Sequence, residues 1–189
     1  LVVFPGAGGD QGWASGNNLW PHLSNLTYAV TADGLTISKY IICPEKNANG
    51  SIRPIGVYAH EFGHALGLPD LYDTTPSGEP DSEGIGDWGL MAGGSHNGSY
   101  GDTPAHMSAW SKYRLGWVEP IVLENNSSFA DGAIFHLDLD NVAENDNQIY
   151  KIYADAYQWN EYFLLENRQL VNFDSGIPGS GLLVYHIDE

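Results

Sequence analysis

The chain has 189 residues, and its 42% of hydrophobic residues is ordinary for a globular protein with one sizeable core. Seven Lys and Arg residues stand against 24 Asp and Glu residues. The resulting net charge of −17 argues against nucleic acid or an anionic membrane as a partner, because both require a basic patch. No apolar run is long enough to span a membrane. The single cysteine, Cys43, permits no internal disulfide, and its neighbours Ile41 and Ile42 predict a buried, inert thiol.

The first 50 residues predict a β-rich region. Residues 1–4 are expected to form a buried strand that leads into a glycine-rich loop at residues 5–9. No Lys-Ser/Thr pair follows this loop, which argues against a phosphate-binding turn. Residues 26–30 and 35–42 are rich in Thr, Tyr, Val and Ile, and the Asp33-Gly34 pair between them predicts a hairpin. Residues 12–22 are expected to be a long surface loop.

The strongest chemical signal is the sequence His60-Glu61-Phe62-Gly63-His64. Residues four apart lie on one face of a helix, so the two imidazoles could bind one metal ion. This HExxH arrangement is the metalloprotease form of a zinc site. Glu61 would then lie beside the metal, where its carboxylate could accept a proton from a water molecule.

The flanks of this motif predict a helix. Pro54 suits the first turn, Gly67 is the expected end, and Pro69 prevents continuation. Apolar residues recur at steps of three and four, forming a stripe of Ile55, Tyr58, Ala59, Phe62 and Leu66. We expect this stripe to pack on the core and the two histidines to project from the opposite side, toward a cleft.

A catalytic zinc site usually has three protein ligands and one open position. Asp70 follows His64 by six residues, where the longer pattern HExxHxxGxxH has its third histidine, and a carboxylate oxygen is an acceptable zinc ligand. We therefore predict Asp70 as the third ligand. Asp73 is the nearest rival, and the alternative role for Asp70 is to cap a turn.

Met91 lies in the glycine-rich sequence 86–94, which permits a tight turn. In the metzincin pattern a methionine in such a turn lies beneath the metal site. We interpret Met91 as the floor of the site; the alternative is an ordinary core methionine that fills a gap.

Downstream, residues 105–115 have helical periodicity, with Gly116 as the expected end. After residue 121 the texture changes to short β-like runs at 133–139, 148–153, 162–166 and 181–187, which predict an antiparallel sheet or a small sandwich. Glu166 with Arg168 forms a polar pair without catalytic spacing. The acidic loop after the zinc motif offers oxygen ligands for calcium, although a solvated loop is the alternative: Asp73, Glu79, Asp81, Glu83 and Asp87.

Three stretches together resemble the immune inhibitor A type of secreted metallopeptidase, within the metzincin clan. These are HEFGHALGLPDLYD at 60–73, GIGDWGLMAGG at 84–94 and PAHMSAWSKYRLGWVEP at 104–120. The resemblance implies a zinc endopeptidase that is exported, often stabilised by calcium, and part of a longer multidomain precursor. It maps His60, His64 and Asp70 to the zinc ligands and Glu61 to the general base.

The resemblance also implies an α+β fold. We expect a metzincin-like catalytic region at residues 1–120, with a twisted sheet, the HExxH helix and a C-terminal helix, followed by a β-rich segment at 121–189. Metzincin domains usually have a strand and a long helix before the region that corresponds to Leu1. We therefore expect either a piece of a longer chain or a lineage without that layer.

The functional prediction is a secreted zinc endopeptidase that acts on proteins or peptides, with calcium as a further candidate ion. One alternative is a non-catalytic, metal-stabilised binding module or an inactive fragment of such a peptidase. Glu61 separates the two, because a zinc site that only stabilises a fold does not require it. A third reading, a buried helix whose histidines only satisfy hydrogen bonds, is weakened by Gly67, Asp70 and Met91 together.

Overall fold

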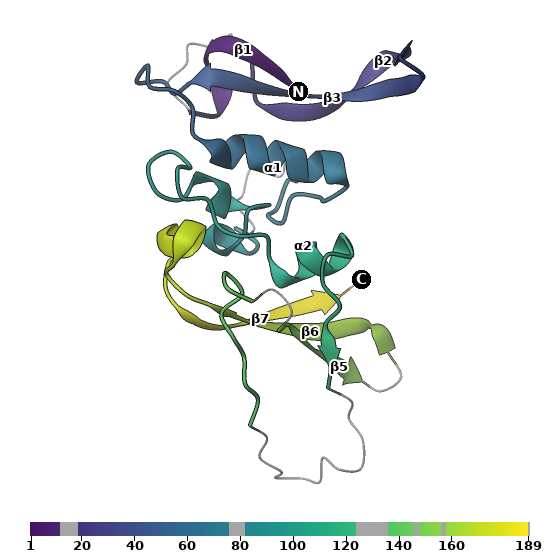
Figure 1. Ribbon diagram of the computed structural model, residues 1–189, viewed down its shortest axis with the longest axis vertical. Coiled ribbons are helices and arrows are strands. Elements are labelled where there is room, and N and C mark those ends of the chain that lie inside the picture. The colour runs from purple at the N-terminus through teal and green to yellow at the C-terminus, as the bar shows by residue number, and fades with distance from the viewer. Residues whose placement is uncertain (12–18, 76–81, 124–135, 146–147, 156–157, 189) are drawn as a thin grey trace.

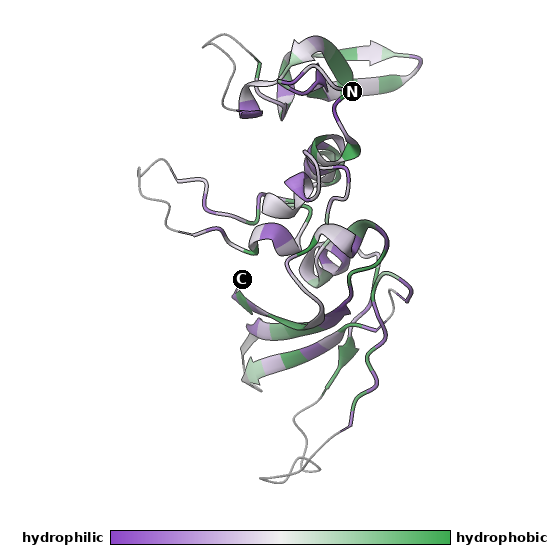
Figure 2. Ribbon diagram, turned by 90° about the vertical axis from the view of Figure 1, so that its left-hand side faces the viewer, coloured by the Kyte–Doolittle hydropathy of each residue, from purple (hydrophilic) through white to green (hydrophobic). Residues whose placement is uncertain are grey.

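The computed structural model describes residues 1–11, 19–75, 82–123, 136–145, 148–155 and 158–188. The fold mixes α and β elements in three layers along its long axis (Figure 1). An N-terminal sheet is followed by a layer of helices and turns, and then by a C-terminal sheet. A view turned by 90° shows the same order, with hydrophobic and hydrophilic residues in bands along the strands of the C-terminal sheet (Figure 2).

The N-terminal sheet has the strand order β1-β3-β2, with bounds β1 (Val2–Ala7), β2 (His22–Ala32) and β3 (Leu35–Lys46). Strands β2 and β3 are antiparallel, and β1 runs parallel to β3. Asp33 and Gly34 both have positive φ, 52° and 78°, as a two-residue type I′ hairpin requires. The predicted hairpin is therefore confirmed, with longer strands than expected. A single 3-10 turn, η1 (Gly9–Gln11), follows β1.

The predicted burial of residues 1–4 is wrong. Val2 and Val3 are about half exposed, at 52% and 49%, because β1 is an edge strand with one neighbour. The buried contacts of this sheet come instead from β3, where Ile41 and Cys43 pack against Val57 of the next helix. Cys43 is fully buried as predicted, and burial raises the pKa of its thiol to about 12.

Helix α1 (Ile55–Leu66) contains the HExxH motif and ends where predicted, although Pro54 lies just before the helix and not in its first turn. It begins directly after Pro54, whose backbone is extended. It ends at Gly67, which has a φ of 105° that other residues rarely adopt. The N–H of Leu68 then donates to the carbonyl of Gly63 at 3.1 Å, which closes the helix end and turns the chain back along the helix.

The predicted packing face of this helix is wrong, although His60 and His64 line a cleft as expected. Ile55 and Phe62, members of the expected core stripe, are 54% and 58% exposed, whereas His60 and Glu61 are buried. Two glycines explain the reversal. A Cβ added at Gly56 would lie 1.9 Å from the carbonyl oxygen of Ser95, and one added at Gly63 would lie 2.3 Å from the sulfur of Met91. The helix therefore packs through its face of glycines and histidines, because that face allows the closest approach.

The segment after α1 is built of short turns, η2 (Gly86–Trp88) and η3 (Gly93–His96), and then a short helix, α2 (Ala109–Arg114). The hydroxyl of Ser108 caps α2 by accepting the N–H of Ser111 at 3.2 Å. Helix α2 is shorter than the predicted 105–115. Residues 105 and 106 instead form backbone hydrogen bonds with the 86–94 loop, from Ala105 N to Gly94 O and from Leu90 N to His106 O.

The C-terminal sheet has the order β4-β5-β6-β7, with bounds β4 (Ile121–Val122), β5 (Tyr150–Asp155), β6 (Gln158–Arg168) and β7 (Gly181–Asp188). A 3-10 turn, η4 (Asn172–Gly176), lies between β6 and β7. Strands β5, β6 and β7 are antiparallel, as predicted, and β4 runs parallel to β5. The predicted strand at 133–139 lies outside the described residues up to 135, and residues 136–139 are not in a strand.

The main hydrophobic core lies between α2 and the C-terminal sheet. Ala109 and Val118 from one side pack against Ile149, Leu164 and Tyr185 from the other. This core joins residues before and after position 120. Among the described residues, no helix combines the length and the apolar character needed to cross a membrane.

Candidate metal centre

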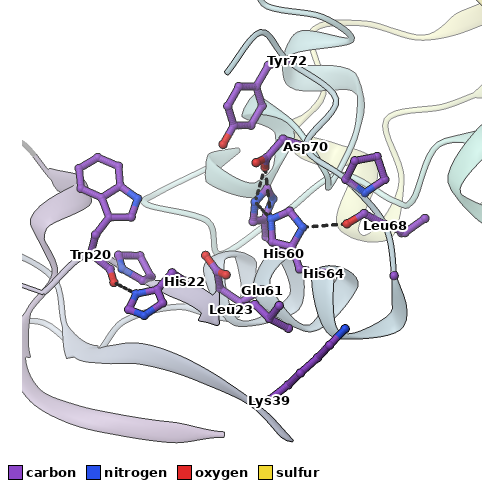
Figure 3. Close-up of a pocket in the computed structure, with 13 residues that line it drawn as sticks. Trp20, His22, Leu23, Lys39, His60, Glu61, His64, Leu68, Asp70 and Tyr72 are labelled. Atoms are coloured by element: carbon purple, nitrogen blue, oxygen red, sulfur yellow. Dashed lines mark hydrogen bonds and ion pairs between the residues drawn. The ribbon is translucent and has the colours of Figure 1, made fainter. Parts of the chain in front are cut away.

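The two histidines of α1 and Asp70 converge on one point (Figure 3). The Nε2 atoms of His60 and His64 lie 3.1 Å apart. Asp70 Oδ1 lies 3.2 Å from the first and 3.3 Å from the second. The turn after Gly67 brings Asp70 back over the helix, so three donor atoms from eleven consecutive residues form a triangle. Within the described part of the chain, this is the one such group of His, Cys, Asp and Glu.

Backbone carbonyls fix the direction of both rings. His60 Nδ1 lies 2.8 Å from the carbonyl oxygen of Leu90, and His64 Nδ1 lies 2.8 Å from that of Leu68. A carbonyl can only accept a hydrogen bond, so each Nδ1 carries the proton. In the neutral rings each Nε2 then holds a bare lone pair, and both lone pairs point at Asp70. This is the tautomer that metal-binding histidines adopt.

The donor set fits a cation. Asp70 Oδ1 is buried without a hydrogen-bond partner, although two imidazole nitrogens surround it. Three lone pairs facing one another repel unless a positive charge lies between them. Ligands at about 2.0–2.1 Å from a tetrahedral zinc ion are separated by roughly 3.3 Å, close to the spacing observed. Two imidazoles and one carboxylate are also a known catalytic zinc set.

The same electrostatics shift the titration of these groups. Asp70 raises the pKa of His64 above its ordinary value of 6.5, chiefly through the contact between the carboxylate and the ring. Burial alone would raise the pKa of Asp70. The two imidazoles and Tyr72 outweigh it, so its pKa is lowered and the group is a carboxylate near neutral pH. The cluster therefore attracts a positive charge, either a proton or a metal ion.

Glu61 is buried beside this triangle and lines the same cleft, where Figure 3 shows its carboxylate on the side toward His22. Its Oε2 atom has no hydrogen-bond partner. Burial raises the pKa of Glu61, and the nearby histidines oppose the shift without cancelling it. A carboxylate with a free oxygen and a raised pKa is suited to accept a proton from water in this cleft.

Met91 is 1% exposed, and its sulfur packs against Gly63 of α1. It contributes no ligand to the triangle. The backbone around it holds the site together: the Leu90 carbonyl accepts from His60, and the Met91 carbonyl accepts from Leu71 N at 2.8 Å. Met91 thus packs against the helix that carries both histidines, and its role as the floor of a metal site stays a prediction.

A cleft of about 630 Å³ opens at the metal centre. The residues that line it come from α1, the turn after it, β2 and β3, and include Trp20, Pro21, His22, Leu23, Lys39 and Tyr72. A second cavity of about 270 Å³ adjoins His60 and Glu61 and is lined by Asp10, Glu83, Ala92 and His96 among others. The site therefore has open space on both sides of Glu61.

Sequence reasoning missed several of these residues. Tyr72 interacts with Asp70, and burial raises the pKa of its own phenol to about 12. Its position two residues after Asp70 was the available signal. The carbonyls of Leu68 and Leu90 are backbone groups, which residue types do not reveal.

The rival third ligand, Asp73, lies outside the triangle. Its Oδ1 atom accepts hydrogen bonds from the backbone N–H and the hydroxyl of Thr75, at 2.8 and 2.7 Å. Two of the acidic residues named as calcium candidates, Glu79 and Asp81, lie outside the described residues. Calcium binding by this loop stays a prediction.

Comparisons with known proteins relate this chain to bacterial peptidases. The family model for the immune inhibitor A peptidase M6 catalytic domain matches residues 6–118, more than half of the chain. The chain is 35% identical over 130 residues to the pre-pro-metalloprotease PrtV of Vibrio cholerae serotype O1, an alignment that covers 61% of this chain and 13% of that protein. It is 46% identical over 76 residues to immune inhibitor A of Bacillus thuringiensis subsp. alesti, covering 39% of this chain and 10% of the relative. The chain thus spans a small part of these relatives' length, and on the family match it belongs to the immune inhibitor A peptidase M6 family.

Proposed function

We propose that this chain carries the active site of a secreted, zinc-dependent endopeptidase of the metzincin type. One observation supports it above the others: three metal-donor atoms, 3.1–3.3 Å apart, share a cleft with a buried carboxylate that has a free oxygen. Similarity to two relatives, a metalloprotease and an immune inhibitor A, supports the same activity.

In this proposal His60, His64 and Asp70 hold the metal, and Met91 packs beneath them. When bound, zinc would supply a Lewis acid that lowers the pKa of a water molecule and polarises the peptide carbonyl. Three protein ligands leave the open position that catalysis requires. The carbonyls of Leu90 and Leu68 keep the two rings in the tautomer that presents Nε2.

Glu61 acts as the general base. Its free Oε2 atom accepts the proton of the attacking water, and the same carboxyl group then donates it to the leaving amine. The raised pKa of Glu61 brings the two protonation states closer in free energy near neutral pH.

The substrate is an extended peptide segment of a protein. Strand β2 is one of the two edge strands of the N-terminal sheet, and its residues His22 and Leu23 line the cleft. An edge strand presents unpaired backbone groups to which an extended peptide can add as a further strand. We propose β2 for this role, which the sequence left unassigned between the predicted strands. The division into a catalytic region at 1–120 and a β-rich segment at 121–189 is likewise a proposal.

The substitution Glu61→Gln tests the function against the non-catalytic alternative. The variant keeps the size of the side chain and should bind zinc as the wild type does. It should lose cleavage of casein or gelatin by at least about a hundredfold, the usual contribution of general acid–base catalysis. Glu161→Gln is a matched control on the exposed face of β6, and it should leave cleavage unchanged. Undiminished cleavage by Glu61→Gln would contradict the mechanism, and a wild-type chain that binds zinc without cleaving would favour the binding module.

A further inference from the structure

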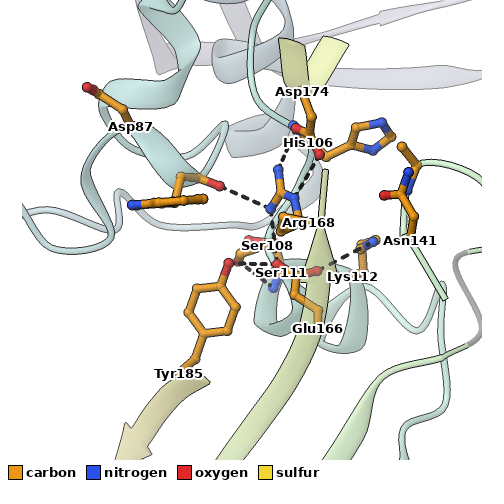
Figure 4. A network of polar contacts seen from close by, with 12 residues as sticks. Asp87, His106, Ser108, Ser111, Lys112, Asn141, Glu166, Arg168, Asp174 and Tyr185 are labelled. Atoms are coloured by element: carbon orange, nitrogen blue, oxygen red, sulfur yellow. Dashed lines mark hydrogen bonds and ion pairs between the residues drawn. The ribbon is translucent and has the colours of Figure 1, made fainter. Parts of the chain in front are cut away.

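A second cluster of polar groups lies away from the cleft, beneath the 86–94 loop (Figure 4). The side chains of Glu166, Arg168 and Asp174 are all 0% exposed. Arg168 Nε donates to Asp174 Oδ2 at 2.7 Å, and Nη2 donates to Asp174 Oδ1 at 2.6 Å, which is a two-pronged ion pair. Nη1 of Arg168 donates to Glu166 Oε1 at 3.0 Å. We call these three residues the arginine network.

Two further side chains close the network around Glu166. The Tyr185 hydroxyl donates to Glu166 Oε1 at 2.6 Å, and the Lys112 ammonium lies 3.9 Å from Oε2. Two cations therefore face two carboxylates, so the charges balance although no solvent reaches them. Removing four charges from water is costly, and apolar residues of similar size often stabilise a fold at least as well. Stability alone therefore does not account for the network.

Two hydrogen bonds connect the network to the loop that holds His60. Nη1 of Arg168 donates to the Trp88 carbonyl at 3.1 Å. Asp174 Oδ1 accepts the backbone N–H of His106 at 2.9 Å, and the carbonyl of His106 accepts the N–H of Leu90 at 3.2 Å. The next bond in this series is the one from His60 Nδ1 to the Leu90 carbonyl at 2.8 Å.

The series runs without a gap from Asp174, through the backbone of His106 and Leu90, to the ring of His60. The backbone of Trp88 is thus hydrogen-bonded to Arg168, and that of Leu90 is linked to Asp174 through His106. The Leu90 carbonyl lies within hydrogen-bond distance of the His60 imidazole. Outer partners of metal-binding histidines fix the ring orientation and commonly change metal affinity 10- to 100-fold when removed.

We infer that Arg168 and Asp174 are positioning residues for the metal centre: they hold the Trp88–Leu90 backbone so that the Leu90 carbonyl orients His60. The metal role of His60 in this inference rests on the proposed function. Both residues lie outside the 6–118 match to the family model, in the β-rich segment. The β-rich segment therefore supplies residues that position His60, and residues 1–118 alone do not contain them.

The test is Asp174→Asn in the full chain. The amide keeps the shape of the carboxylate but loses its charge and replaces one acceptor oxygen with a donor. If the amide oxygen takes the place of Oδ1, the new NH2 group faces Arg168 Nε; if the amide is turned the other way, it faces Nη2 and the His106 N–H. Zinc affinity, measured by competition with a chromophoric chelator below the unfolding temperature, should fall at least about tenfold. The matched control is Lys151→Met. Lys151 is 5% exposed in the same sheet, and its ammonium contacts the rings of Tyr113, Tyr153 and Tyr162. This control should lower the melting temperature while zinc affinity stays at the wild-type value.

A second readout does not depend on metal. In chelator-treated protein, the ring Nδ1–H proton of His60 should give a protected NMR signal that shifts and exchanges faster in Asp174→Asn, and stays unchanged in Lys151→Met. If wild-type protein binds no zinc through His60, the proposed function fails, and this signal still tests the positioning role. An unchanged signal together with unchanged zinc affinity in Asp174→Asn would overturn the inference.

Asp174→Asn removes a buried charge and could prevent folding, so a third measurement uses the wild type alone. In native-state hydrogen exchange at increasing denaturant, the amides of Leu90 and His106 should open in the same cooperative step as those of Glu166 and Arg168. If the Leu90 amide exchanges in an earlier, separate opening while β6 stays closed, the network does not hold the loop and the inference is wrong.

Discussion

The candidate metal centre and the arginine network are both clusters of buried or half-buried ionisable groups, but they differ in how their unpaired atoms are compensated. In the network, all three guanidinium nitrogens of Arg168 have acceptors. Glu166 Oε2 is the one carboxylate oxygen there without a hydrogen bond, and it faces the Lys112 ammonium at 3.9 Å, so that two cations balance two carboxylates. In the metal centre, Asp70 Oδ1 and Glu61 Oε2 are buried without hydrogen-bond partners. Buried polar atoms are nearly always paired in folded proteins, so an unpaired set calls for an explanation. The arginine network is therefore a closed cluster that holds structure, whereas the candidate metal centre is an open cluster suited to receive a cation and a substrate.

The largest expected difference between the two clusters is that the candidate metal centre requires a cation for activity. Treatment with a chelator should abolish peptide cleavage, and zinc add-back should restore it. We expect a loss of at least about a thousandfold, because a catalytic metal supplies several kcal/mol of transition-state stabilisation. Proteolysis of a fluorogenic peptide in metal-free buffer provides the measurement. Cleavage that persists after complete removal of metal would contradict the role assigned to the centre.

Breaking the arginine network should destabilise the folded protein strongly. Arg168→Met leaves Asp174 and Glu166 without their main cation, and breaking a buried ion pair in this way typically costs about 3–5 kcal/mol of unfolding free energy. Urea denaturation followed by circular dichroism measures the change. The exposed Arg114→Met in α2 is the control, and it should stay within about 0.5 kcal/mol of the wild type. Equal effects of both substitutions would mean that the network is not a structural cluster.

The third ligand can be separated from its rival by substitution. Asp70→Ala removes one corner of the triangle and should weaken zinc binding by more than about a hundredfold, beyond the range seen for outer partners. Asp73→Ala removes only the contacts with Thr75 and should leave zinc affinity close to the wild-type value. Isothermal titration with zinc measures both. A larger loss in Asp73→Ala would reassign the ligand.

The smallest expected effect is on pH dependence. Protons and zinc compete for His64 in the candidate metal centre, so stability and zinc affinity should change with pH in opposite directions. Asp70 raises the pKa of His64, so in metal-free protein this pair adds stability that is fully present below pH 6.5 and is lost as pH rises through the folded-state pKa. Zinc binds the unprotonated ring, so its affinity should change in the opposite sense and increase with pH, by at most about tenfold per unit for this single proton. Calorimetry in buffers of different ionisation enthalpy should detect proton release on zinc binding. Zinc binding without proton release near pH 6.5 would show that zinc does not displace a proton from His64.

How far the sequence could predict this molecule depended on distance along the chain. The convergence of His60, His64 and Asp70 was predictable because they lie within eleven residues, and because helix periodicity and the turn at Gly67 determine their relative positions. The arginine network was not. Arg168 contacts a carbonyl 80 residues away, and Asp174 contacts an N–H 68 residues away, and neither backbone partner has a residue signature.

The orientation of α1 could not be predicted for a different reason. The apolar stripe of Ile55 and Phe62 predicted the wrong packing face, because the stripe rule assumes that burial follows side-chain hydrophobicity. In α1 the packing face is determined by how closely neighbouring segments can approach. Gly56 and Gly63 leave room for the Ser95 carbonyl and the Met91 sulfur, so the face with the histidines is buried and the apolar face is exposed. The hairpin at Asp33-Gly34, by contrast, depends on local turn chemistry and was predictable.

X-ray absorption spectroscopy of the zinc-loaded chain tests the central claim most directly. The account predicts two imidazole nitrogens at about 2.0–2.1 Å and a carboxylate oxygen at about 2.0–2.2 Å, with the imidazole signal lost in a His60→Ala, His64→Ala double variant and the first-shell oxygen contribution reduced in Asp70→Ala. A zinc spectrum without imidazole, or one unchanged in these variants, would contradict it.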